Sequence, residues 1–110
     1  MKLPNWEDAY IPLEKLTDYL LSETHHVGKY KARVLRSVGL DQSNVDVLEQ
    51  GLITIAHCQE VIETTSSPYG TKYVVEGLLR TPTGDILQIQ TVWIIETGQD
   101  RPRFVTAYPV

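Results

Sequence analysis

The sequence predicts an α+β domain in which N-terminal helices pack on a four-stranded antiparallel β-meander. Apolar residues recur with a period of about 3.6 up to about residue 60 and with a period of about 2 after it, which indicates helices followed by strands. Short turn segments join the strands of the second half, so neighbouring strands must be antiparallel. The chain has 110 residues, which suits one domain and leaves no room for two. We therefore expect residues 1–110 to form a single domain.

The first half of the chain carries the signals of three helices after an extended arm over residues 1–11. Pro12 suits the first position of a helix, where its missing N–H is not needed. Gly39 suits the position just after the end of a helix. The three predicted helices run from Pro12 to about Ser22, from about Lys29 to Val38, and from a cap at Asp41 or Ser43 to near Cys58.

The second half alternates β-type runs with turn residues such as Pro and Gly. The predicted strands cover residues 60–65, 71–81, 86–97 and 103–108. In the third strand, Thr91 interrupts an otherwise apolar face. In the last strand, simple alternation predicts that Phe104, Thr106 and Tyr108 share one face.

Composition and charge narrow the class of protein. Hydrophobic residues make up 42% of the chain and charged residues 22%, as in ordinary folded domains. The single cysteine suits a reducing compartment, and the chain shows no signal peptide and no membrane-spanning segment. We therefore expect a cytoplasmic protein. The net charge of −4 means that any binding of RNA must depend on a local basic patch.

The second predicted helix concentrates positive charge. On a helical wheel, Lys29, Arg33 and Arg36 share one face, while Lys31 falls within the apolar arc of Tyr30, Val34, Leu35 and Val38. An unpaired ammonium is costly to bury, so Lys31 must reach solvent along its stem, meet a buried partner, or serve a phosphate in a cleft beside the sheet. The outward basic face is either solvated or a contact surface.

A loop with two histidines precedes this helix. His25 suits proton transfer near neutral pH, and the helix start at Gly28 offers backbone N–H groups to an anion. The alternative is that His25 and His26 are exposed loop residues without a role. A metal site is not expected, because the histidines and Cys58 lack the spacing of a ligand set.

Polar residues of the last two strands form a second candidate group. Thr91, Arg103, Thr106 and Tyr108 could line a site, although Thr91 also fits a hydrogen-bonded core threonine. The sequence contains no Walker motif, Rossmann fingerprint or GxSxG. Nucleotide cofactors and serine hydrolysis are therefore not expected, and no cofactor is predicted.

Five segments together resemble a small uncharacterised bacterial domain family across essentially the whole chain: MKLPN, THHVGKYKARV, SPYGTKYVV, TVWII and RPRFVTAYPV. The H-x-x-G-x-x-KA element of that family corresponds to His25, Gly28 and Lys31. His26 stands where the family element has proline. The same domain resembles C-terminal modules of polymorphic toxins with the barnase, EndoU, colicin and RelE-like ribonuclease fold.

This resemblance implies RNA cleavage by general acid/base chemistry without metal. His25 would act as general base or acid, Lys31 and Arg103 would stabilise charge on the phosphate, and Thr106 and Tyr108 would orient it. Substrate contacts would come from four further residues: Gly28, Lys29, Arg33 and Thr91.

A non-catalytic reading stays open beside the enzymatic one. The chain would then bind a protein partner, such as a cognate antitoxin or immunity-like protein, through its exposed strands and basic helix. The acidic net charge departs from that of a typical toxin of this kind.

Overall fold

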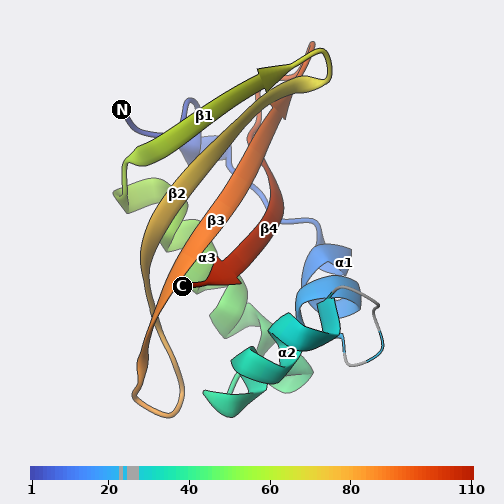
Figure 1. Cartoon of the computed structure of the whole chain (residues 1–110), viewed down its shortest axis with the longest axis vertical. Helices are drawn as coiled ribbons and strands as arrows, with labels where there is room; N and C mark the ends of the chain where they lie inside the picture. The colour runs from blue at the N-terminus through green and yellow to red at the C-terminus, as the bar shows by residue number, and fades with distance from the viewer. Residues whose placement is uncertain (23, 25–27) are drawn as a thin grey trace.

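The computed structural model describes residues 1–22, 24 and 28–110, and it confirms the α+β architecture (Figure 1). Helices occupy the first part of the chain and an antiparallel sheet the second. The helical elements are η1 (Trp6–Asp8), α1 (Leu13–Lys15), η2 (Leu16–Leu20), α2 (Gly28–Ser37), η3 (Gln42–Asn44) and α3 (Val45–Cys58). The strands are β1 (Val61–Ser67), β2 (Gly70–Arg80), β3 (Ile86–Glu96) and β4 (Arg103–Pro109), and they lie in the order β1-β2-β3-β4.

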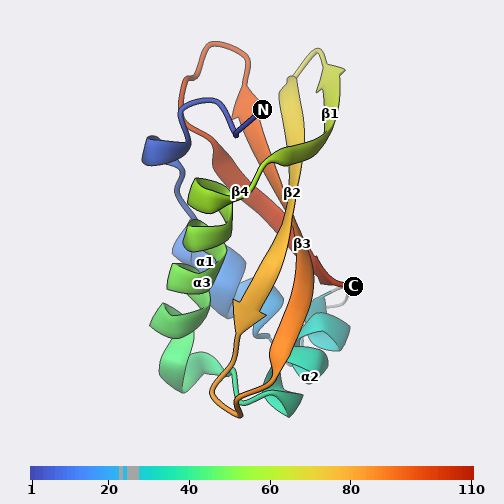
Figure 2. The same cartoon turned by 90° about the vertical axis from the view of Figure 1, so that its left-hand side faces the viewer.

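The helices are arranged around one face and one edge of the sheet. Figure 2 shows α1 and α3 on one side of the strands, with α2 beside the C-terminal end of β4. The described helices include none that is long and apolar enough to cross a membrane.

The N-terminal arm is less extended than predicted, and it contacts the sheet at two places. The arm contains the short 3-10 helix η1, and its Leu3 side chain is fully buried. Lys2 forms an isolated bridge with Glu60, and Tyr10 forms one with Arg103. The arm therefore contacts both the strand at the start of the sheet and the strand at its end.

The first predicted helix is interrupted by a change of helix type. One turn of α-helix, α1, leads into the π-helix η2, where the Leu21 N–H donates to the Leu16 carbonyl at 2.8 Å. The predicted helix from Pro12 to about Ser22 is thus a helical segment over residues 13–20, and only its first turn is α-helical. The wider turn lets Leu16, Leu20 and Leu21 all be buried, so core packing here overrides the regular period.

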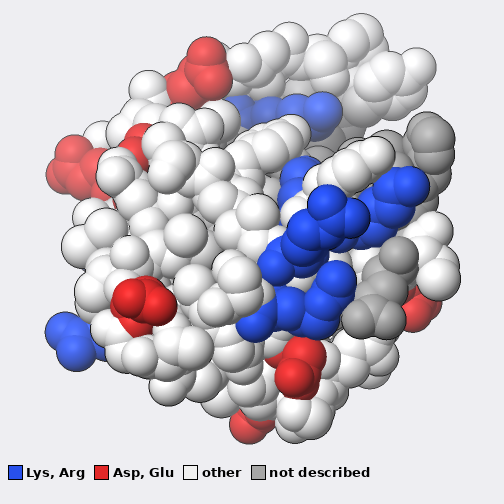
Figure 3. All heavy atoms as spheres, turned by 60° about the horizontal axis from the view of Figure 1, so that its bottom comes forward, with Lys and Arg blue, Asp and Glu red and all other residues white. Residues whose placement is uncertain are grey.

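Helix α2 is rotated relative to the apolar arc that the sequence suggested. Its buried residues are Ala32 and Leu35, whereas Tyr30 and Val34 are exposed, so the prediction for those two residues was wrong. The reason is that α2 packs on η2 and on the edge strand β4 and needs only a narrow apolar stripe. Lys and Arg side chains gather on this end of the molecule, as Figure 3 shows.

Helix α3 begins after the predicted cap. The Asp41 carboxylate accepts hydrogen bonds from the Ser43 hydroxyl at 2.5 Å and from the Ser43 N–H at 2.8 Å, and Asn44 completes a capping box. These bonds hold the pKa of Asp41 below its ordinary value. The cap thus fixes the start of η3, and α3 follows at Val45 without a side-chain cap of its own.

Strand β4 contains one extra residue, Val105, at the point where its register against β3 shifts. Phe104 and Ala107 both lie in the core, although residues three apart face opposite sides of a regular strand. Because the bulge adds one residue, Phe104 and Ala107 can both face the core, and Thr106 and Tyr108 point to the other face. The prediction that Phe104, Thr106 and Tyr108 share a face was therefore wrong.

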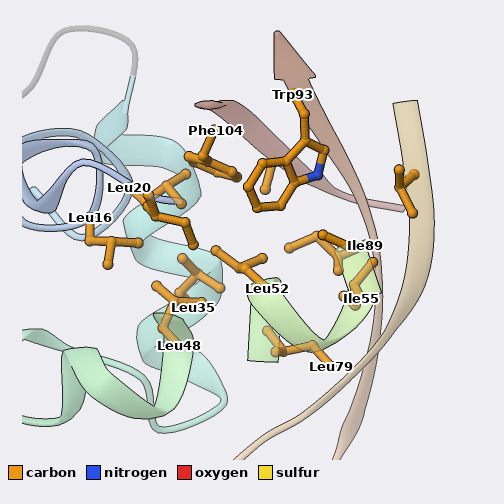
Figure 4. Close-up of a cluster of buried hydrophobic side chains, with 14 of the residues drawn as sticks. Leu16, Leu20, Leu35, Leu48, Leu52, Ile55, Leu79, Ile89, Trp93 and Phe104 are labelled. Atoms are coloured by element: carbon orange, nitrogen blue, oxygen red, sulfur yellow. The ribbon is translucent and has the colours of Figure 1, made fainter. Parts of the chain in front are cut away.

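The core fills the space between the sheet and the helices (Figure 4). Trp93 of β3 packs edge-to-face on Phe104 of β4, with ring centroids 5.3 Å apart. Leu48 and Leu52 of α3 are fully buried in the same cluster. Much of the stability of the domain should come from this burial.

Two adjacent leucines of β2 provide a matched test of this core. Leu79 is 1% exposed and Leu78 is 64% exposed. We expect Leu79→Ala to lower the free energy of unfolding by about 2–5 kcal/mol, because it leaves a cavity. Leu78→Ala should lower it by less than about 1 kcal/mol. Urea denaturation of both variants checks this, and equal losses would contradict the assignment of the core face.

Candidate functional site

Three helical and strand elements bring Lys31 to a cluster of hydroxyl groups. Lys31 Nζ donates to Tyr19 Oη at 2.6 Å and to Thr106 Oγ1 at 2.7 Å. The two hydroxyl oxygens lie 3.0 Å apart and share a hydrogen bond. The same Nζ lies 4.2 Å from the centre of the Tyr108 ring and 4.9 Å from that of Tyr19. We call these four residues the Lys31 cluster.

Each member of the Lys31 cluster is held by its local structure. Tyr19 comes from η2 and Lys31 from α2, and these two elements pack directly on each other. Thr106 and Tyr108 come from the part of β4 that follows the bulge. Lys31 and Tyr19 are half-buried, Thr106 is buried and Tyr108 is 47% exposed, so the cluster borders on solvent beside Tyr108.

The positive charge of Lys31 changes the chemistry of Tyr19. Burial alone would raise the pKa of the Tyr19 phenol, but hydrogen bonds from Lys31 and Thr106 outweigh it, together with the charges of Lys31 and Lys15. The pKa of Tyr19 therefore lies below its ordinary value. A phenol of this kind is a stronger acid than a free tyrosine.

Lys31 meets hydroxyl groups and not a carboxylate among the described residues. Hydroxyl partners satisfy two of its three donors without cancelling its charge. Among the described residues, Lys31 therefore does not form the buried ion pair that was one of its predicted roles. A fixed, uncancelled ammonium at the border of solvent is suited to binding an anion.

The structure brings together only part of the predicted site. Lys31, Thr106 and Tyr108 lie in one cluster. Arg103 pairs with Glu96 instead, with its Nε donating to the carboxylate at 2.8 Å. Thr91 is fully buried in the core, where it donates to the Val75 carbonyl and accepts from the Trp93 indole. Thr91 is thus enclosed away from the surface, and substrate contact by this residue is not supported.

The remaining predicted residues lie in or near α2. His25 lies outside the described residues, as does His26. Gly28 is the first residue of α2, and Arg33 is exposed while Lys29 is half-buried. A group of three or more His, Cys, Asp or Glu that could hold a metal is absent from the parts of the chain that the structure describes.

Tyr19 is the member of the cluster that the sequence did not reveal. Its place among Leu13, Leu16 and Leu20 at helical spacing indicated a core aromatic residue. A tyrosine in such a stripe needs a hydrogen-bond partner for its hydroxyl. This need was the only sequence feature that pointed to a polar role for Tyr19. It could not identify the partner.

Comparison with known proteins identifies the family. The profile described as "Domain of unknown function (DUF6883)" matches residues 2–110, and the chain belongs to this family. No curated protein matches the chain.

Among solved structures, a similar chain comes from the "Contact-dependent growth inhibition toxin - immunity protein complex from Klebsiella pneumoniae 342". The TM-score is 0.73 at 14% sequence identity, and the match covers 94% of this chain and 95% of that chain. An identity this low shows a shared fold alone and carries no information about activity.

Removal of the Lys31 ammonium should have a modest effect on folding. Lys31→Met keeps most of the stem and leaves Tyr19 and Thr106 bonded to each other, so we expect a loss of about 1–2 kcal/mol in the free energy of unfolding. Loss of one partner from a buried ion pair would cost roughly 3–5 kcal/mol. Denaturant unfolding distinguishes the two, with exposed Lys72→Met as a control that should change stability by less than about 0.5 kcal/mol.

Alkaline titration should reveal the altered phenol. In the wild type, one tyrosine should ionise below the ordinary range; Tyr19→Phe should remove that step and Lys31→Met should raise its pKa. Because the folded pKa is depressed, ionisation of Tyr19 adds stability that is complete above the unfolded pKa and is lost as pH falls through the folded pKa. Tyrosinate absorbance measures the ionisation, with exposed Tyr69→Phe as the control. If Tyr19→Phe still showed a tyrosine that ionises below the ordinary range, the assignment of this ionisation to Tyr19 would be contradicted.

Proposed function

We propose that this DUF6883 domain is a ribonuclease-toxin-like domain that cleaves RNA by general acid/base chemistry without metal. The observation that carries the proposal is the Lys31 cluster, in which an uncancelled ammonium lies within hydrogen-bonding distance of an acidified phenol. Positive charge at the phosphate and a group ready to transfer a proton are the two requirements of this reaction.

The chemistry divides between the two sides of the scissile phosphate. The ribose 2′-oxygen attacks phosphorus while its proton passes to His25, and the bond to the 5′-oxygen breaks. Tyr19 gives its proton to that leaving oxygen. The products are a 2′,3′-cyclic phosphate and a free 5′-hydroxyl. Lys31 stabilises the charge that develops on the phosphate, and Thr106 and Tyr108 position the ammonium.

Arg103 has a smaller part in this proposal than the sequence suggested. Its Nε donates to the Glu96 carboxylate, so part of its positive charge is already balanced. The charge of Lys31 is not balanced in this way, because its partners are hydroxyl groups. Charge stabilisation therefore rests on Lys31.

A partner-binding function is the second candidate, and one observation favours it. Strand β1 lies at the edge of the sheet and is exposed along nearly its whole length, which leaves an edge that another chain can extend. The similar solved chain comes from a complex of a toxin with an immunity protein. An immunity-like or antitoxin-like protein is the partner that this candidate implies, and such a partner is compatible with an active enzyme.

Cleavage of RNA in the presence of a chelator tests the enzymatic proposal. We expect the wild type to leave 2′,3′-cyclic phosphate ends and Lys31→Met to lower the rate roughly 100- to 1000-fold. Lys2→Met removes the same charge next to the N-terminus, which lies at the opposite end of the molecule from α2 (Figure 1), and this variant should cleave at the wild-type rate. His25→Ala combined with Lys31→Met should lose less than the sum of the two effects. Intact RNA after incubation with the folded wild type would reject the enzymatic proposal and leave partner binding.

A further inference from the structure

The exposed side of α2 joins an aromatic ring to two cations. Tyr30 is 60% exposed. Lys29 Nζ lies 5.2 Å from the centre of its ring, and Arg33 Cζ lies 5.8 Å from it. We call Lys29, Tyr30 and Arg33 the α2 face. A large exposed ring on a helix whose buried side is elsewhere is not needed for the core.

The charge around the α2 face is concentrated and positive. The chain has ten Lys and Arg against fourteen Asp and Glu, yet α2 contains four of the basic residues and no acidic residue. Among the described residues, Lys29 and Arg33 have no carboxylate partner. Figure 3 shows the resulting run of basic side chains at this end of the molecule. An anionic ligand is the complement of such a surface.

We infer that the α2 face binds single-stranded RNA beside the Lys31 cluster, with Lys29 and Arg33 on phosphates and Tyr30 stacked on a base. The inference rests on the proposed function for the identity of the strand. Tyr30 and Lys31 are consecutive residues of α2, so their side chains leave the helix about 100° apart. A strand with a phosphate at Lys31 would follow the surface of α2 to place a neighbouring base at Tyr30.

The ring of Tyr30 decides between ligand classes. An acidic protein segment would use the two cations and leave the exposed ring without a role. A duplex would present phosphates but keep its bases stacked inside. A single strand offers alternating phosphates and free bases, which match cations on either side of an aromatic ring.

Binding of a labelled single-stranded 2′-O-methyl RNA tests the inference, because this probe lacks the 2′-hydroxyl and cannot be cleaved by the proposed route. We expect Tyr30→Ala to weaken binding roughly 5- to 100-fold through lost stacking, and Tyr30→Phe to bind within about two-fold of the wild type. Tyr30 is exposed, so both variants should fold as the wild type does.

Charge is tested separately by the double variant Lys29→Gln/Arg33→Gln. The dependence of log K on log salt should become shallower by about 1.4, since each phosphate contact on a single strand contributes about 0.7. The matched control is Lys2→Gln/Arg80→Gln, which removes the same two residue types from other elements and should keep the wild-type slope.

Several results would overturn the inference. These are wild-type affinity in Tyr30→Ala, equal weakening by the control pair, equal affinity for a duplex of the same length, or equal competition by poly-glutamate. Cleavage of ordinary RNA, measured in parallel, separates the two proposals. Binding that depends on the α2 face without cleavage would reject the ribonuclease function alone, and cleavage that is indifferent to the α2 face would reject this inference alone.

Discussion

The pairing of β3 with β4 is the constraint on which the candidate site depends. Strand β3 must bury Trp93 on its inner face, and Phe104 of β4 packs against it. The extra residue Val105 then lets Ala107 return to the core and sends the intervening Thr106 toward Lys31. Without the bulge, alternation would place either Ala107 or Phe104 outside the core. The bulge thus completes the core and also supplies Lys31 with a hydrogen-bond acceptor, Thr106.

The partners of Lys31 and Arg103 show how two cations near one strand acquire different roles. Arg103 donates from Nε to the Glu96 carboxylate, so a negative charge already lies beside it. Lys31 is bonded to Tyr19 and Thr106, which orient the ammonium and leave its charge in place. An anion could therefore bind at Lys31 without the free-energy cost of first breaking an ion pair. This orientation without neutralisation is what the proposed role of Lys31 in binding a phosphate requires.

Much of the fold follows from local signals in the sequence. The change of hydrophobic period located the border between helices and strands. Of the two predicted caps, Asp41 or Ser43, the structure shows Asp41 capping the 3-10 helix η3, after which α3 begins at Val45. The π-turn of η2, the rotation of α2 and the bulge in β4 did not follow, because each is set by tertiary packing and not by propensity. A helical wheel treats α2 as if it lay on a broad apolar surface, whereas its real neighbours are η2 and a strand edge.

The site was predictable only in part for the same physical reason. The position of Lys31 on the wheel identified an ammonium that needed a partner. Its partners lie 12 and 75 residues away in the chain, and no local pattern connects them. Tyr19 in particular belongs to a stripe of leucines, so its hydroxyl becomes visible as a functional group only when the fold places Lys31 beside it.

The distribution of charge makes the proposed binding of RNA compatible with an acidic chain. Charges more than about 8 Å apart are largely screened at physiological ionic strength, so a strand at α2 is influenced by the local basic residues more than by the net charge of −4. Outside α2 the chain carries fourteen acidic and six basic residues, and this excess would repel a continuing phosphate backbone. Under the proposed function, contact would therefore be confined to the few nucleotides that the α2 face and the Lys31 cluster can reach. A short contact of this kind contributes limited affinity but fixes which phosphate lies at Lys31, and registration of one phosphate is the part of binding that cleavage requires.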